Sequence, residues 1–149
     1  MKPFPAFSFL IFLSLASCTE YNLEIADSPA NCNGFEDSFG FPADANVTQV
    51  YYYADEFGAD VRYQLSFKCP RFVVDKIISE LSLKPVPQDT ADSLLDPRDD
   101  LPWWQPDSID GRDLWIKEEK NQYYRQLWYS EKDGMAFYLE KMPELREKT

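Results

Sequence analysis

The chain contains no histidine. Histidine is the commonest general base and metal ligand in proteins, so this chain alone cannot build a Ser-His-Asp or Cys-His catalytic site. Its three cysteines lie far apart and form no CxxC pair, which removes the usual zinc sites. It also lacks the GxxxxGK[ST] and GxGxxG phosphate-binding loops. We therefore expect no cofactor, no bound metal and no enzymatic activity.

Acidic residues outnumber basic ones, 26 to 15, and the formal net charge is −11. Nucleic acid is not an expected partner, because Lys and Arg supply the neutralisation of phosphates. The carboxylates leave one enzymatic alternative, a glycosidase-like site. It would need two acidic groups facing each other across a cleft at roughly 5–10 Å.

Calcium is a further alternative, because two loop segments are rich in aspartate. They contain Asp96, Asp99 and Asp100 in the first and Asp107, Asp110 and Asp113 in the second. Neither has the spacing of an EF-hand loop. A solvated acidic loop with local turns is the leading interpretation.

The longest apolar run covers residues 4–15 and is too short to cross a bilayer as a helix, which takes about 20 residues. Lys2 precedes it and small residues follow it, which is the layout of a secretory signal peptide. The run ends in Leu15-Ala16-Ser17-Cys18, which resembles the lipobox of bacterial lipoproteins.

This resemblance implies that residues 1–17 are removed and that Cys18 is acylated and anchors the protein in a membrane. Two or three acyl chains hold a protein firmly in a membrane, because each buried methylene contributes about 0.8 kcal/mol of binding free energy. Thr19, where retention at the inner membrane would call for Asp, implies the outer membrane in a cell with two membranes, and otherwise the outer face of the cell membrane. The alternative is an ordinary signal peptide cut near Ala16, which would leave Cys18 as a free thiol.

If Cys18 carries lipid, Cys32 and Cys69 remain as the other two cysteines. Two cysteines in an exported chain predict a disulfide bond. Closing the long loop between them would stabilise the fold by about 4 kcal/mol on chain-entropy grounds.

Hydrophobic patterns predict one small domain over residues 46–141. Residues 47–53 and 61–67 are expected strands, the second with strict alternation of apolar and polar positions. Apolar residues at helical spacing within 69–85 predict an amphipathic helix with Pro70 in its first turn. Residues 122–129 and 135–142 are expected to form a hairpin closed by Gly134.

This β-β-α-β-β order predicts an α+β fold, a small antiparallel sheet with one helix on one face. Residues 18–45 follow no period and are expected to be a tether and an irregular segment. Residues 142–149 are expected to be a tail. Residues 85–113, rich in Pro, Asp and Trp, are expected to form a long surface loop.

The second face of such a sheet is either exposed or covered. The leading interpretation is that the loop carrying Trp103 and Trp104 folds over it and seals a small core. If the face is exposed, its aromatic side chains could bind a glycan or an apolar ligand. The candidate ligand-binding residues are Trp103, Trp104, Tyr124 and Trp128, with Tyr52 and Tyr138 as further members of the aromatic surface.

The leading functional hypothesis is a lipid-anchored, exported and non-enzymatic protein that interacts with another protein of the cell envelope. The alternative is a module that binds a glycan or an apolar ligand. A covered sheet face would favour the first hypothesis, and an exposed aromatic groove would favour the second.

Overall fold

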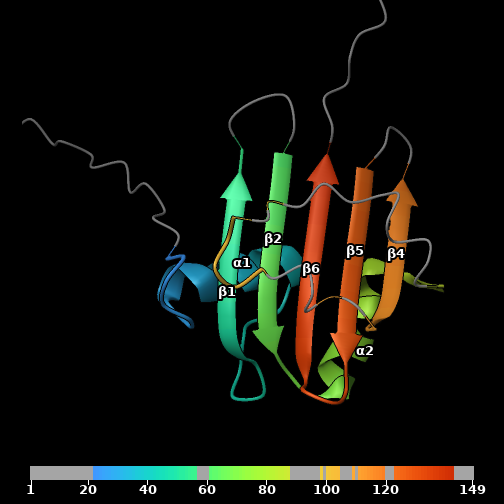
Figure 1. Cartoon of the computed structure of the whole chain (residues 1–149), viewed down its shortest axis with the longest axis horizontal. Helices are drawn as coiled ribbons and strands as arrows, with labels where there is room; N and C mark the ends of the chain where they lie inside the picture. Colours follow the sequence, from blue (N-terminus) through green and yellow to red (C-terminus); the bar gives the residue numbers. More distant parts are fainter. Residues whose placement is uncertain are drawn as a thin grey trace, which may run out of the picture.

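The computed structural model describes residues 22–56, 61–87, 98, 100–104, 109, 111–119 and 123–142. Six strands form one antiparallel sheet in the order β1-β2-β6-β5-β4-β3 (Figure 1). The fold is therefore mixed α+β and mostly sheet. The elements are α1 (Pro29–Phe39), β1 (Thr48–Asp55), β2 (Val61–Lys68), α2 (Arg71–Leu81), β3 (Lys84–Val86), β4 (Asp113–Glu119), β5 (Tyr123–Ser130) and β6 (Met135–Met142).

The elements with the clearest patterns in the sequence are present. β1 and β2 form an antiparallel pair, and β5 and β6 form a hairpin in which Gly134 has a φ of +69°. α2 buries the side chains of Val73, Val74, Ile77 and Leu81. Pairing of β2 with β6 joins the two hairpins into one sheet.

One helix lies where an irregular segment was expected. α1 begins after Ser28, whose hydroxyl accepts from the Asn31 N–H at 3.2 Å, and it has proline in its first turn. It brings Phe35 and Phe39 into the core. The packed unit therefore starts well before residue 46, and the expectation of a tether over 18–45 was wrong over α1.

Two strands were also missed. β3 and β4 lie at the ends of the segment expected to be a loop, and they pair with each other while β4 also pairs with β5. β3 has only three residues. β4 has only three apolar residues, Leu114, Trp115 and Ile116, which face alternate sides of the sheet. The predicted β-β-α-β-β order is therefore incomplete, because it omits α1, β3 and β4.

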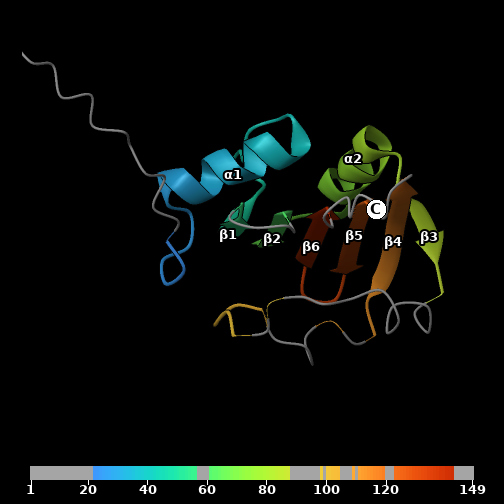
Figure 2. The same ribbon diagram turned by 90° about the horizontal axis from the view of Figure 1, so that it is seen from above.

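The sheet is packed on both sides. Figure 2 shows both helices on one face of the sheet. The described residues of the segment between β3 and β4, hereafter the β3–β4 loop, pack on the other face. The helix face carries the larger core, to which both helices contribute. The opposite face, hereafter the loop face, carries a second core that includes Leu101, Trp104, Ile109, Trp128 and Phe137.

Cys32 and Cys69 are both free thiols, so the structure does not contain the predicted disulfide. Cys32 lies in the first turn of α1, which is fastened to the edge strand β1 by a hydrogen bond from the Asn31 amide to the Val50 carbonyl. Cys69 follows β2 and donates its N–H to the Gly134 carbonyl in the β5–β6 turn. Each cysteine is thus held by a different part of the sheet.

Among the described residues, no helix is both long and apolar enough to cross a membrane.

Candidate functional site

The tryptophan cluster forms a core. Trp104 and Trp128 have no exposed surface, and their rings meet edge to face with centroids 6.0 Å apart. Trp103 lies at the rim of this core, stacked on Tyr51 at 5.7 Å, and Tyr124 is half-buried. The loop face is therefore covered, as the leading interpretation predicted.

The remaining candidates do not complete one surface. Tyr52 and Tyr138 belong to the core on the helix face, whereas Trp104 and Trp128 belong to the core on the loop face. The structure divides the predicted aromatic surface between two sides of the sheet, with two of its tryptophans fully buried.

Polar contacts fasten the β3–β4 loop over the sheet. The buried Gln64 amide donates to the Arg98 carbonyl at 3.2 Å and accepts from the Arg98 N–H at 2.8 Å. The Arg98 guanidinium also donates to the Tyr53 hydroxyl at 2.8 Å. At the other end of the loop, Arg112 binds both carboxylate oxygens of Asp133, at 2.9 and 2.6 Å.

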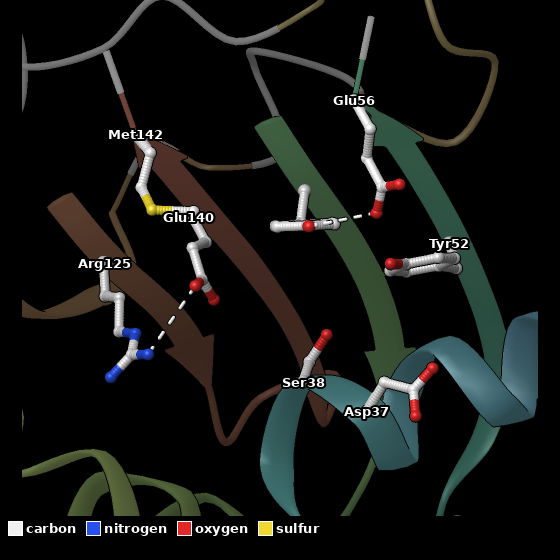
Figure 3. A pocket seen from close by; sticks show the side chains of 8 residues that line it. Asp37, Ser38, Tyr52, Glu56, Arg125, Glu140 and Met142 are labelled. Atoms are coloured by element: carbon white, nitrogen blue, oxygen red, sulfur yellow. Dashed lines mark hydrogen bonds and ion pairs between the residues drawn. The ribbon is translucent and has the colours of Figure 1, made fainter. Parts of the chain in front are cut away.

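The helix face carries a pocket of about 380 Å³ at the end of the sheet away from the β5–β6 turn (Figure 3). α1, β1 with the residue after it, β2, β5 and β6 all contribute. The lining residues, in chain order, are Asp37, Ser38, Tyr52, Glu56, Tyr63, Arg125, Glu140 and Met142.

Strand register brings the central residues of the pocket together. Tyr63 on β2 lies opposite Glu140 on β6, and Glu140 lies opposite Arg125 on β5. Side chains alternate between faces along a strand, so these three share the helix face with the buried Leu65, two residues along β2 from Tyr63. A tyrosine, an acid and a base therefore form one row across three strands.

Glu140 is the most engaged carboxylate of the pocket. It accepts hydrogen bonds from the hydroxyls of Tyr123 and Tyr138, the second at 2.6 Å, and lies 3.6 Å from the Arg125 guanidinium. Both of its oxygens thus have donors, and its side chain is 11% exposed. These contacts fix the position of the carboxylate between the two phenols and the guanidinium.

The environment of Glu140 shifts the neighbouring groups. Burial, reinforced by Glu140, raises the pKa of Tyr138 and of Tyr123, so both phenols stay protonated and donate. Burial lowers the pKa of Arg125, but the oxygens of Tyr138 and Glu140 outweigh it and the net pKa is raised. The cluster thus places one guanidinium and two phenol donors around the Glu140 carboxylate.

The opposite wall of the pocket is aromatic. The rings of Tyr52 and Tyr63 stack with centroids 6.3 Å apart and planes 13° apart, and the Tyr63 hydroxyl donates to Glu56 at 3.0 Å. Tyr52 fits beneath α1 where residue 34 is glycine: a Cβ there would lie 2.3 Å from the ring. α1 therefore approaches the sheet closely enough to place Asp37 and Ser38 at the pocket.

Sequence reasoning missed this site. Arg125 and Glu140 lie two residues along their strands from Leu127 and Tyr138, which face the core. A charged residue on the core-facing side of a strand is unusual. That anomaly was the available signal. The sequence does not show that Tyr63, Arg125 and Glu140 are neighbours, because this depends on β6 lying between β2 and β5 in the sheet.

Several predicted features lie outside the described residues. They are the signal peptide 1–17, Cys18, the tail after residue 142, and Asp96, Asp99, Asp107 and Asp110 of the acidic segments. Within the described part of the chain, no group of three or more acidic or cysteine side chains is placed to hold a metal ion.

Comparison of the chain with protein-family models, with curated proteins and with solved structures finds no match.

Proposed function

We propose that this chain is an exported lipoprotein that acts by binding another protein of the cell envelope, without catalysis. The observation that decides between this role and its alternative is the covered loop face, where Trp104 and Trp128 have no exposed surface. A glycan or apolar ligand bound on that face would need these rings at the surface. The covered face favours protein interaction over that alternative.

The anchor rests on the sequence that ends at Cys18 and on how soon the packed chain begins after it. The Asn22 carbonyl accepts from the Asn31 amide at 3.1 Å, and Leu23 packs against the core of the loop face. Three residues then separate an acylated Cys18 from Asn22 at the start of the packed unit, a reach of at most about 14 Å. The domain would be held directly at the lipid surface, within reach of other envelope proteins.

A Cys18→Ser variant tests the anchor. Wild-type protein should sediment with membranes and have an intact mass that lacks residues 1–17 and includes acyl chains. The variant should lose the acyl mass and the firm membrane association. Cys32→Ser is the matched control and should behave as wild type. Equal membrane association and identical processing of the Cys18→Ser chain would remove the anchor from this proposal.

Cross-linking in intact cells tests the interaction. Wild-type and Cys32→Ser chains should give the same discrete cross-linked species, and these should fall sharply for Cys18→Ser at equal expression. Cross-linked species that persist unchanged in the Cys18→Ser chain would contradict an interaction that requires anchoring at the membrane.

A further inference from the structure

The pocket on the helix face has an excess of negative charge. Asp37, Glu56 and Glu140 supply three carboxylates, and Arg125 supplies one guanidinium. Tyr63 lies opposite Glu140 in the strand register and donates to Glu56, and Figure 3 shows Asp37 below these two acids and Arg125 on the outer flank. Two of the carboxylates are therefore neighbours of the Tyr63 side chain.

These carboxylates are compensated to different degrees. Glu140 has its ion pair with Arg125 and its two phenol donors. Asp37 and Glu56 are exposed, and in the described part of the chain neither forms an ion pair with a basic side chain. The pocket therefore has two carboxylates, those of Asp37 and Glu56, whose charge no basic side chain of the described chain offsets.

We propose that this pocket binds an alkylammonium group. A primary ammonium placed near the Tyr63 ring would be attracted by Asp37 and Glu56 at short range and by the face of the phenol ring. Its alkyl chain would lie along Met142 and Tyr52, which supply the apolar part of the lining. Anions are repelled by the same charges, and neutral ligands gain nothing from them.

This ammonium has two sources, a free diamine or the lysine side chain of a partner protein. The second deepens the proposed function and rests on it, because it names the chemistry by which an envelope protein would be recognised. The site itself does not depend on the anchor at Cys18.

Methionine labelled with ¹³C at its methyl group gives a direct test in the full-length purified chain. Met142 lines the pocket, whereas Met135 packs against the core of the loop face, so one spectrum holds a reporter and an internal control. Titration with 1,5-diaminopentane should shift the Met142 signal in a saturable way and leave Met135 unchanged. The neutral 1,5-pentanediol should shift neither signal.

Charge-removing variants assign the effect to the pocket. Glu56→Gln keeps an acceptor for Tyr63, and Asp37→Asn keeps the size of the side chain. Each should weaken diamine binding about fivefold, and 0.5 M salt should weaken it further. Glu80→Gln, an exposed residue of α2 outside the pocket, removes the same charge and should change the affinity less than twofold.

A lysine tripeptide with blocked ends, compared with its norleucine analogue, separates the two sources. Binding of the lysine peptide with a Met142 shift supports a protein partner, and binding of the diamine alone supports a free amine. The proposal is overturned if neither ammonium probe shifts Met142, if the diol binds as well as the diamine, or if Glu80→Gln weakens binding as much as Glu56→Gln. These outcomes are independent of the fractionation of Cys18→Ser, so the two proposals can fail separately.

Discussion

Replacing Trp104 by alanine should destabilise the protein by about 3–4 kcal/mol. The side chain is fully buried and touches Trp103, Trp128 and Phe137 edge to face. A buried tryptophan removes about 150–250 Å² from water, which at about 25 cal/mol per Å² amounts to about 4–6 kcal/mol as an upper estimate. The alanine retains part of this, and measured Trp→Ala losses in cores run at about 3–5 kcal/mol.

The loss has a ceiling set by the docking of the β3–β4 loop. If the loop detaches from the sheet in the variant, the change in unfolding free energy cannot exceed the free energy that held the loop down. The hydrogen bonds between Gln64 and Arg98 and between Arg112 and Asp133 oppose detachment, because they fasten the loop independently of Trp104. We therefore expect most of the packing loss to appear in global stability.

Urea unfolding followed by far-UV circular dichroism measures this change. Trp104→Phe should recover more than half of the loss, since it restores an aromatic ring to the same site. Phe72→Ala is the control, because Phe72 is 61% exposed on α2 and should change stability by no more than about 0.5 kcal/mol. A loss below about 1 kcal/mol for Trp104→Ala would refute the buried position of this ring and reopen an exposed aromatic face.

Three further measurements follow from the structure. Gly34→Ala should lower the unfolding free energy by about 1–2 kcal/mol, because overpacking against the tyrosine beneath α1 outweighs the gain in helix propensity. The hydrogen bond from Arg112 lowers the pKa of Asp133, so this pair stabilises above about pH 4 and its contribution is lost as the pH falls through the folded pKa. Asp133→Asn should lower the unfolding free energy by only about 1 kcal/mol at pH 7, since Asp133 is 46% exposed. At pH 2, where the carboxyl group of the wild-type protein is largely protonated, the effect should be small. Burial raises the pKa of the Cys69 thiol to about 12, so Ellman's reagent should label Cys69 in urea but not in the folded protein at pH 8; a thiol unreactive in urea would indicate a disulfide.

The parts of the fold that could be predicted are those where the sequence pattern is long and regular. β2 alternates over its whole length, and α2 buries residues at helical spacing behind Pro70. The β5–β6 turn needs a left-handed residue and has Gly134 there. In each case the conformation that the local sequence prefers is also the one that buries the apolar residues, so both criteria predict the same element.

The missed elements are short and depend on tertiary contacts. α1 has a capping serine and a proline in its first turn, but its only large apolar side chains in the core are Phe35 and Phe39, so no apolar period is visible. β3 contains Pro85, which lowers strand propensity and is tolerated because β3 is an edge strand. The disulfide prediction rested on the number of cysteines in an exported chain and placed Cys32 in an irregular segment, whereas Cys32 lies in α1 and both cysteines are free thiols.

The pocket could not be predicted because its residues meet only through the order of the strands. An interior face of a sheet is an expensive place for Arg125 and Glu140, since a buried ion pair is often no more stabilising than apolar residues of the same size. The fold accepts the pair and supplies two phenols to hold its acid. A charge that departs from the surrounding pattern marks a candidate site for function. Elsewhere the two faces bury mostly apolar side chains, with Gln64, Ser66 and Gln126 as polar exceptions, so the end bearing Tyr63, Arg125 and Glu140 is where the ammonium-binding proposal places recognition.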